Sequence, residues 1–431
     1  MSRIVPLTVL AAVLAVVACT SDVTDRAVEV EVVEVFGPWR GVDADHFAEV
    51  LAPFEDSSGI DVRYVGSVDF VTDLLDRVGD GNAAPSVAMI PQPALIRQLA
   101  AGENIVPLAP EMLDEVLQNF GPDGAALGLV DGRYYTVPYR ISLKSLVWYR
   151  PDVFAEQGWS IPSSLDELTA LVERIEADAQ FAPWCLGINA GTSTGWAATD
   201  WAEDLVLRTV GPDDYQRWAI GEIRFDDPDI AAAFEQFRSL VLDSGRTSGG
   251  AGAIVETPVD EAIRPLLTDP PGCALHRQAD FAANWLPDGK SIGPEGDVDV
   301  FVLPGVDGGS PPLLVGATQA AQFDRDPSTD ALMTYLSSSE AAVIWARRGG
   351  FLSLNQLVPD DVYDDDYLRD LAAAIEEAPA VVFDASDQMP PEIGSDLLWD
   401  RITAWVAGTT DYDDFAAEID EARAELEARR P

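Results

Sequence analysis

The amino-acid sequence predicts an α/β protein built from two lobes. Short apolar strands alternate with amphipathic helices over residues 28–101, which is the pattern of a parallel sheet with crossover helices. Strand-like segments recur over residues 133–316, before a largely helical tail that starts at residue 326. At 431 residues the chain is also longer than one ordinary domain. We therefore expect the chain to cross between two lobes more than once.

The first six elements follow from the spacing of apolar residues. Valine alternates with glutamate before Gly37, which predicts a strand with one solvated face. The predicted order is strand 28–36, helix 43–57, strand 60–65, helix 70–78, strand 86–90 and helix 92–101. In parallel sheets, ligands bind outside the carboxyl ends of the strands. Residues that follow these strands and are therefore candidate ligand contacts are Trp39, Arg40, Ser67, Asp69 and Gln92.

The rest of the chain is predicted in the same way. Strands over residues 133–138 and 144–149 bracket Tyr139 and Arg140, which we expect to form one crossing between lobes. Helical spacing then dominates residues 153–243, interrupted by a strand at 184–189. The remaining predicted strands, after a stretch rich in glycine and proline, are 298–302 and 313–316. The chain has no fixed-period repeat, which argues against solenoid and propeller folds.

Composition excludes one class of function. The chain has 27 Lys and Arg residues against 74 Asp and Glu residues, which gives a formal net charge of −47. Nucleic-acid binding needs a surface of Lys and Arg, and no stretch supplies one. Hydrophobic residues make up 47% of the chain, enough for a folded core. The acidic surface disfavours anionic ligands.

The N-terminus is typical of an export signal. Arg3 precedes an apolar run at residues 4–18 that is short for a membrane span. The letters VVAC at residues 16–19 resemble the bacterial lipobox, in which the signal is cut before a cysteine that carries lipid. We expect Cys19 to anchor the exported protein to the outer face of the cytoplasmic membrane. The alternative is a plain secretory signal with an incidental cysteine.

The other two cysteines form an even pair in an exported chain, where disulfides persist. We therefore predict a disulfide between Cys185 and Cys273. The alternative is two buried thiols.

The segment GTSTG at residues 191–195 fits G-x-S-x-G. One interpretation is the nucleophile elbow of a lipid-anchored serine esterase, with Ser193 as nucleophile and His276 as base. The other is a turn whose Ser and Thr side chains cap the next helix. We favour the second, because a single histidine follows and no oxyanion loop precedes the motif.

We expect no metal site. The two histidines, His46 and His276, are too few for a transition-metal centre when two cysteines pair. An acidic segment resembles a calcium loop, but Thr329 and Tyr335 stand where an EF-hand needs glycine and glutamate. Asp326 before a proline instead predicts a helix cap. With 74 acidic residues, a carboxylate pair for a glycoside-active enzyme can always be nominated, so that third alternative has little support.

Several large aromatic residues stand in loops or at the ends of elements instead of in helical stripes: Trp39, Trp196, Trp285 and Phe351. Flat aromatic faces suit the apolar faces of sugar rings, while polar groups bind the hydroxyls. Trp39 is the strongest candidate, because the sheet edge places it in the crevice.

Longer segments resemble a known family. They are DGRYYTVPYR at 131–140, SLVWYRPDVFAEQGW at 145–159, WARRGGFLS at 345–353 and FDASDQMP at 383–390. Together they are similar to the family 1 extracellular solute-binding proteins of carbohydrate ABC transporters, and most of all to the α-glucoside-binding lipoproteins. The resemblance implies a two-lobed Venus-flytrap fold, also called the periplasmic-binding-protein fold, in which each lobe has a mostly parallel sheet flanked by helices.

The family also implies a function and a division of the chain. A monomer would close on a neutral sugar and deliver it to a membrane permease, with no cofactor and no catalysis. The expected division is a signal peptide at 1–18, a tether at 19–27, an N-terminal lobe at 28–138 and 312–347, and a C-terminal lobe at 139–311 and 348–431. Ligand positions implied by the resemblance are Trp39, Arg40, Ser67, Asp69, Tyr139, Arg140, Trp196, Trp285 and Phe351. Asp200 either binds sugar or caps a helix, and Asp387 is either structural or binding.

Overall fold

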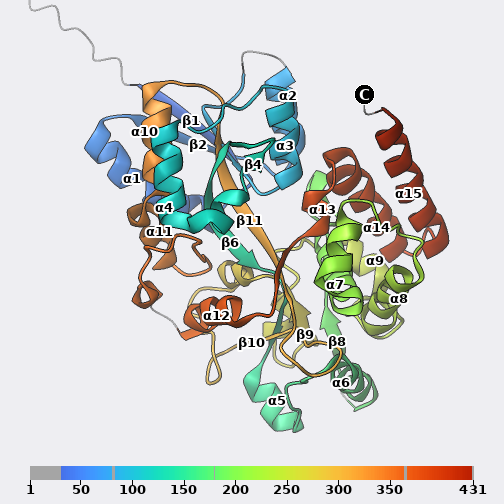
Figure 1. Cartoon of the computed structure of the whole chain (residues 1–431). Helices are drawn as coiled ribbons and strands as arrows, with labels where there is room; N and C mark the ends of the chain where they lie inside the picture. The colour runs from blue at the N-terminus through green and yellow to red at the C-terminus, as the bar shows by residue number, and fades with distance from the viewer. Residues whose placement is uncertain (1–30, 80–82, 179, 364–365, 430–431) are drawn as a thin grey trace, which may run out of the picture. The chain divides into compact units, whose positions relative to one another are not determined.

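Two β-sheets organise the part of the chain that the structure describes (Figure 1). The computed structural model describes residues 31–79, 83–178, 180–363 and 366–429. The strands are β1 (Val32–Gly37), β2 (Asp61–Gly66), β3 (Val87–Ile90), β4 (Leu129–Val130), β5 (Arg133–Tyr134), β6 (Thr136–Leu143), β7 (Leu146–Tyr149), β8 (Ala182–Cys185), β9 (Cys273–Arg277), β10 (Asp299–Val302), β11 (Leu313–Gln322) and β12 (Val381–Phe383). The first sheet has the order β12-β11-β3-β1-β2 with β6 also paired to β11, the second has the order β10-β7-β9-β8, and β4 pairs with β5.

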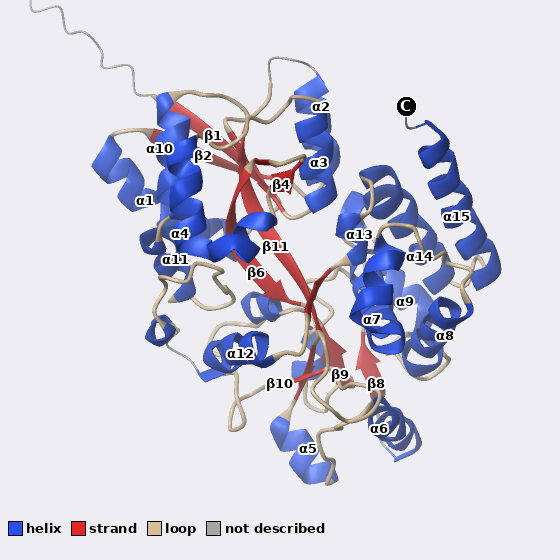
Figure 2. Cartoon of the chain, viewed as in Figure 1, coloured by secondary structure: helices blue, strands red, loops and turns tan. Residues whose placement is uncertain are grey.

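Helices connect and cover these strands (Figure 2). They are α1 (Val42–Ser58), α2 (Phe70–Gly79), α3 (Pro93–Ala101), α4 (Pro110–Ala126), α5 (Pro151–Gln157), α6 (Leu165–Asp178), α7 (Trp196–Ala219), α8 (Pro228–Phe237), α9 (Gly250–Glu256), α10 (Pro327–Ser337), α11 (Ser339–Ala346), α12 (Asp366–Glu377), α13 (Ala385–Gln388), α14 (Trp399–Val406) and α15 (Tyr412–Arg429). The predicted cap of α10 is confirmed, because Asp326 accepts a hydrogen bond from the Ser328 N–H.

Both faces of the first sheet are covered by helices. Successive side chains of β1 point to opposite faces, so Val35 packs on the side of α1 while Phe36 stacks on Phe70 of α2. The face of this strand that was predicted to be solvated is covered in part. Glu34 is half-buried and forms an ion pair with Arg77, because α2 crosses over that face.

The expected α/β class is confirmed, and the strand pairing refines it. As the β-α-β order predicts, β1 pairs in parallel with both β2 and β3. In the second sheet, β8 and β9 are parallel, whereas β7 runs antiparallel to both β9 and β10. The second sheet is therefore mixed and not mostly parallel. β7 enters it directly from the first sheet and runs in the opposite direction to both of its neighbours, β9 and β10.

The chain passes from the first sheet to the second between β6 and β7, through Lys144 and Ser145, and returns between β10 and β11. The crossing predicted at Tyr139 and Arg140 stays a prediction. Both lie inside β6, which pairs with β11 along its length. The lobe boundaries drawn from the sequence stay a prediction.

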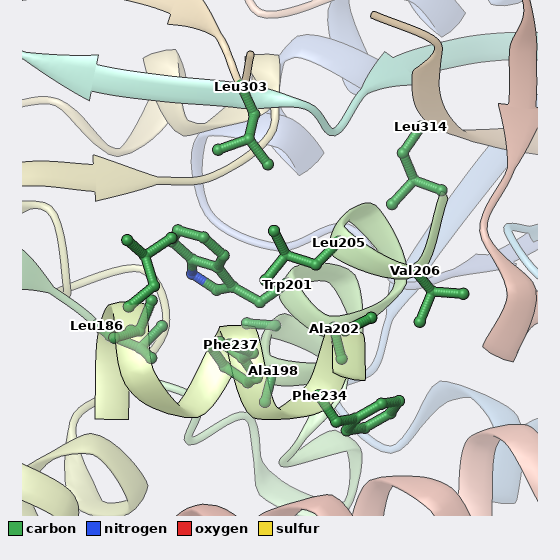
Figure 3. Packing of buried hydrophobic residues seen from close by; sticks show 14 of the residues in the cluster. Leu186, Ala198, Trp201, Ala202, Leu205, Val206, Phe234, Phe237, Leu303 and Leu314 are labelled. Carbon is green, nitrogen blue, oxygen red and sulfur yellow. The ribbon is translucent and has the colours of Figure 1, made fainter. Parts of the chain in front are cut away.

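The core around the second sheet is built on α7. Trp201, Leu205 and Phe234 pack together in it (Figure 3). Trp201 also stacks on Phe237 with 5.6 Å between ring centroids, and its edge meets Trp184 of β8. α7 is thereby fixed between the sheet and α8, so the side chains at its N-terminal end hold defined positions.

A disulfide links Cys185 at the end of β8 to Cys273 at the start of β9, with 5.5 Å between the Cα atoms. The predicted pairing is confirmed. Cys19 and the predicted export signal lie outside the described residues. Within the described part of the chain, no helix is both long enough and apolar enough to span a membrane.

Candidate functional site

A cavity of about 830 Å³ opens at the carboxyl ends of the first-sheet strands. The loops that follow β1, β2 and β3 supply Trp39, Arg40, Ser67 and Gln92 to its wall. The predicted strand-end edge is therefore the edge that faces the cavity. The rest of the wall includes residues of three later segments, 189–200, 281–285 and 384–387.

Trp39 lines the cavity, but it is held mainly by packing. It is 7% exposed, and its ring lies 5.0 Å from that of Phe47 and 4.8 Å from that of Trp345. Its backbone N–H donates to Tyr64 Oη at 2.8 Å. A Cβ atom at Gly66 would lie 2.1 Å from the carbonyl oxygen of Trp39, so only glycine fits there. The loop after β1 is thus fixed by contacts with β2.

Arg140 is a buried cation at the cavity wall. One of its Nη atoms donates to the Gly350 carbonyl at 2.5 Å, and the other lies 3.7 Å from the Asp43 carboxylate. Asn284 Nδ2 also donates to Asp43, at 2.6 Å. These contacts join β6, α1 and the 3₁₀ turn η4 (Asp280–Trp285) in one polar network.

Three aromatic rings form what we call the aromatic wall: Trp196, Phe281 and Trp285. All three line the cavity. The centroid of the Phe281 ring lies 6.1 Å from that of Trp196 and 5.3 Å from that of Trp285. The sequence indicated the two tryptophans but missed Phe281, which is one of many phenylalanines and becomes distinctive only through its neighbours.

A second feature of the wall is the carboxylate cluster, defined as Lys144, Asp200, Glu203, Asp384 and Asp387. Lys144 Nζ donates to Asp200 Oδ1 at 2.9 Å and also to Asp384. Because α7 supplies the first two acidic residues and α13 lies next to it, four acidic side chains surround one lysine.

The cluster also positions α13. The carboxylate of Glu203 accepts hydrogen bonds from the N–H groups of Ala385 at 2.7 Å and Ser386 at 3.0 Å. Asp384 Oδ1 accepts from the Ser386 hydroxyl and from the Asp387 N–H. These bonds satisfy donors at the start of a short helix that packing alone would hold weakly.

Burial shifts the pKa values in the cluster. Burial raises the pKa of Asp200 to about 7, against the opposing effect of Lys144. Burial alone would lower the pKa of Lys144, but Asp200 and Asp384 raise it well above its ordinary value. Burial and then Asp384 raise the pKa of Asp387. Lys144 is therefore a permanent cation between Asp200, which partly retains a proton near neutral pH, and Asp384, whose pKa Lys144 lowers against the effect of burial.

Lys144 and Asp384 were missed by sequence reasoning. Their only local signal is a lysine between two apolar strands and an aspartate in the FDASDQMP segment. Asp200, for which two roles were open, is the fifth residue of α7 and bonds Lys144, so it does not cap that helix.

Asp69 does not line the cavity as predicted. Its Oδ1 accepts hydrogen bonds from the Thr192 hydroxyl at 2.5 Å and from the Thr192 N–H at 3.3 Å. Ser193 Oγ also donates to the Val68 carbonyl, at 3.4 Å. Asp69 is instead a contact between the loop after β2 and the turn η1 (Gly191–Ser193).

Tyr139 and Phe351 also lie away from the cavity wall. Both are fully buried, with 5.4 Å between their ring centroids, and Phe351 stacks on Trp345 at 5.1 Å. Because β6 continues through Tyr139, its side chain points into the core of the first sheet. Neither ring lines the cavity. Tyr139 packs against Trp39 with 5.9 Å between ring centroids, and Phe351 packs against Tyr139 and Trp345.

The structure does not form the serine–histidine pair that the esterase alternative requires. His276 is buried in β9, where its Nδ1 lies 3.0 Å from the Cys185 carbonyl oxygen and its Nε2 has no partner. Ser193 bonds Val68 instead. The predicted helix cap is wrong as well: the N-cap of α7 is Gly195, and the Thr194 hydroxyl closes the preceding turn by donating to Gly191.

No group of three or more His, Cys, Asp or Glu side chains in the described residues is arranged to hold a metal ion.

Comparison with known proteins places the chain in a family. The model of the family described as bacterial extracellular solute-binding protein matches residues 43–346. The chain belongs to this family. It is 36% identical over 379 residues to the osmoprotective compounds-binding protein GgtB of Synechocystis, a match that covers 87% of this chain and 89% of that protein. It is 34% identical over 391 residues to the alpha-glucosides-binding periplasmic protein AglE of Rhizobium meliloti, covering 88% and 84%.

Solved structures agree on the fold of this solute-binding protein. A chitin oligosaccharide binding protein matches with a TM-score of 0.80 at 18% identity, covering 93% of this chain and 99% of that one. The predicted periplasmic-binding-protein fold is therefore confirmed.

Proposed function

We propose that this solute-binding protein binds a neutral carbohydrate, in particular an α-glucoside, and delivers it as a monomer to the permease of an ABC importer without catalysis. The observation that carries the proposal is that one cavity joins the aromatic wall to paired buried charges. Aromatic faces suit the apolar faces of sugar rings, and charged side chains form strong hydrogen bonds with hydroxyls. The names of GgtB and AglE, which refer to osmoprotective compounds and α-glucosides, support the same class of ligand.

The charges of the cavity favour a neutral ligand. Its wall contains four cationic side chains, counting Arg and Lys, and five Asp side chains. Arg140 faces Asp43, Lys144 faces Asp200 and Asp384, and Arg264 pairs with Glu261, so three of the four cations are already matched by carboxylates. The ligand contacts we propose are Trp39, Arg40, Ser67, Gln92, Arg140, Trp196 and Trp285.

Delivery would depend on closure of the two predicted lobes around the sugar. The Asp69–Thr192 contact joins a loop of the first sheet to the segment before α7, and it is the kind of contact that closure would form. Sugar contacts made on both sides would shift the population toward the closed form.

A thermal-shift screen over neutral mono-, di- and trisaccharides tests the proposal. Because a ligand that binds the folded state stabilises it, we expect a sugar-dependent rise in melting temperature without release of glucose. A panel that includes maltose, trehalose and sucrose and gives no shift would contradict the proposal. Covalent labelling by a fluorophosphonate would instead point to an esterase.

We further propose that lipid on Cys19 holds the protein at the outer face of the cytoplasmic membrane. The support is the VVAC sequence at residues 16–19. Full-length protein should fractionate with membranes, and the Cys19→Ala variant should be released or remain as the uncleaved precursor. Equal membrane association of both proteins, with cleaved N-termini, would contradict the anchor.

A further inference from the structure

Lys144 has a hydrogen-bond donor that is not used within the part of the protein that the structure describes. Its ammonium group has three N–H donors, and two of them are used by Asp200 and Asp384. The side chain is 10% exposed and lines the cavity, and its Cε passes 3.1 Å from where a Cβ of Gly316 would stand. Nζ lies 5.9 Å from the centroid of the Trp196 ring, and its two acceptors leave one N–H for a ligand in the cavity.

Asp387 offers the matching acceptor. It lines the cavity with Lys144, is 8% exposed, and is joined to Lys144 through the Asp384 carboxylate, which both residues bond. Its backbone N–H is bonded to Asp384, but no hydrogen bond to its carboxylate is formed within the described residues. In either protonation state the carboxyl group presents an oxygen that accepts a hydrogen bond.

The other acidic groups of the carboxylate cluster are already occupied. Both oxygens of Glu203 accept from backbone N–H groups of α13, and both oxygens of Asp384 are bonded. Asp200 gives one oxygen to Lys144, and its other oxygen is buried 3.7 Å from Arg277 Nη1. Asp387 is thus the member whose oxygens are both unbonded and reachable from the cavity.

We infer that Lys144 and Asp387 are a specificity-determining pair that binds two neighbouring hydroxyl groups of a sugar ring lying against Trp196. A hydroxyl both accepts and donates a hydrogen bond, so a donor beside an acceptor matches a vicinal diol. A site built to bond hydroxyls rejects an analogue that lacks one, because the protein groups are then left unpaired. The inference rests on the proposed function and assigns the polar end of the same cavity.

The test uses Asp387, because removing Lys144 would leave buried carboxylates without a cation. Asp387→Ala removes the acceptor and no internal hydrogen bond of the carboxylate. The matched control is Asp396→Ala, which removes an exposed aspartate nine positions along the chain that does not line the cavity. Calorimetry measures affinity for whichever of maltose, trehalose or sucrose gives the largest thermal shift with the unmodified protein.

We expect Asp387→Ala to weaken binding at least tenfold and Asp396→Ala to leave it unchanged. The melting temperature without sugar should stay within about 2 °C for both variants. A large fall in the melting temperature of Asp387→Ala would overturn the inference by giving Asp387 a structural role. An affinity equal to that of the unmodified protein would overturn it as well.

Monodeoxy analogues of the same disaccharide give an independent readout. Against the unmodified protein, loss of either of two adjacent hydroxyls should weaken binding strongly, and against Asp387→Ala the same losses should matter much less. Equal losses for both proteins would contradict the assignment. If none of the three sugars binds the unmodified protein, the proposed function itself fails. If a sugar binds both proteins with equal affinity, only the role of Asp387 fails.

Discussion

Two tryptophans at the cavity show how burial separates a structural role from a binding role. Trp39 packs between aromatic rings of the first-sheet core, whereas Trp285 is only partly buried and belongs to the aromatic wall. A ring with an open face can stack on a ligand, and a ring enclosed by others mainly contributes packing energy.

Trp285→Ala should therefore weaken sugar binding at least tenfold, about 1.4 kcal/mol, with little loss of stability. Trp39→Ala should instead cost about 3–5 kcal/mol of folding free energy, because it opens a hole in a packed cluster. Calorimetry and urea unfolding separate the two effects. Unchanged affinity in Trp285→Ala would remove it from the site.

Lys144 supplies the positive charge within the carboxylate cluster. Lys144→Met leaves Asp384 buried without a counter-ion and leaves Asp200 with Arg277 alone, so we expect a loss of about 3–5 kcal/mol in the free energy of unfolding. Urea unfolding near neutral pH measures it. Exposed Lys290→Met, which breaks a surface pair with Asp297, should cost about 1 kcal/mol or less. Equal costs would show that the cluster is not tightly coupled.

At the scale of elements, η4 and β6 are joined by a buried carboxyl group. Asp280 Oδ1 accepts from the Leu143 N–H at 2.7 Å, and Oδ2 has no partner. Burial raises the pKa of Asp280 to about 7 in spite of nearby Arg140. Its link to the end of β6 is therefore made largely in the protonated form at mildly acidic pH.

This pKa predicts a dependence of stability on pH. Between pH 3.8 and about 7 the folded state holds a proton on Asp280 that the unfolded state has released, so stability falls as pH rises. The contribution is at most about 1.4 kcal/mol per pH unit. Asp280→Asn keeps an oxygen for Leu143 and should lose this slope, as urea unfolding at several pH values would reveal. Parallel pH curves for both proteins would contradict the prediction.

The contact between the loop after β2 and η1 yields a second prediction at this scale. Asp69→Ala removes the acceptor for Thr192 without altering the cavity wall, so it should weaken all sugars by a similar factor, about fivefold. Asp76→Ala is the control, because Asp76 is an exposed aspartate of α2 that does not line the cavity. Calorimetry with two different sugars checks it, and a loss confined to one sugar would indicate direct ligand contact.

At the scale of the whole molecule, the net charge of −47 bears on the kind of solute. Such a field repels anionic sugars and phosphates and also disfavours contact with an anionic membrane surface. Attachment to the membrane would then depend on lipid at Cys19 and on the permease. The acidic surface and the balanced cavity thus favour the same class of neutral ligand.

The sequence could predict features that depend on local order. Strand ends located Trp39, Arg40, Ser67 and Gln92, because the carboxyl ends of parallel strands share one edge. It could not predict contacts set by tertiary packing. Lys144 meets partners 56 and 240 positions away, which no local pattern encodes. Asp69 was misplaced for the same reason, since Thr192 lies 123 positions away.

The cavity should hold a neutral sugar. Isothermal titration calorimetry of the intact protein with maltose, trehalose and sucrose, compared with glucose 6-phosphate, tests it most directly. We expect saturable binding of at least one neutral disaccharide, weakened by Trp285→Ala, and no binding of the phosphorylated sugar. Binding of the phosphorylated sugar in preference to all three neutral disaccharides would contradict it.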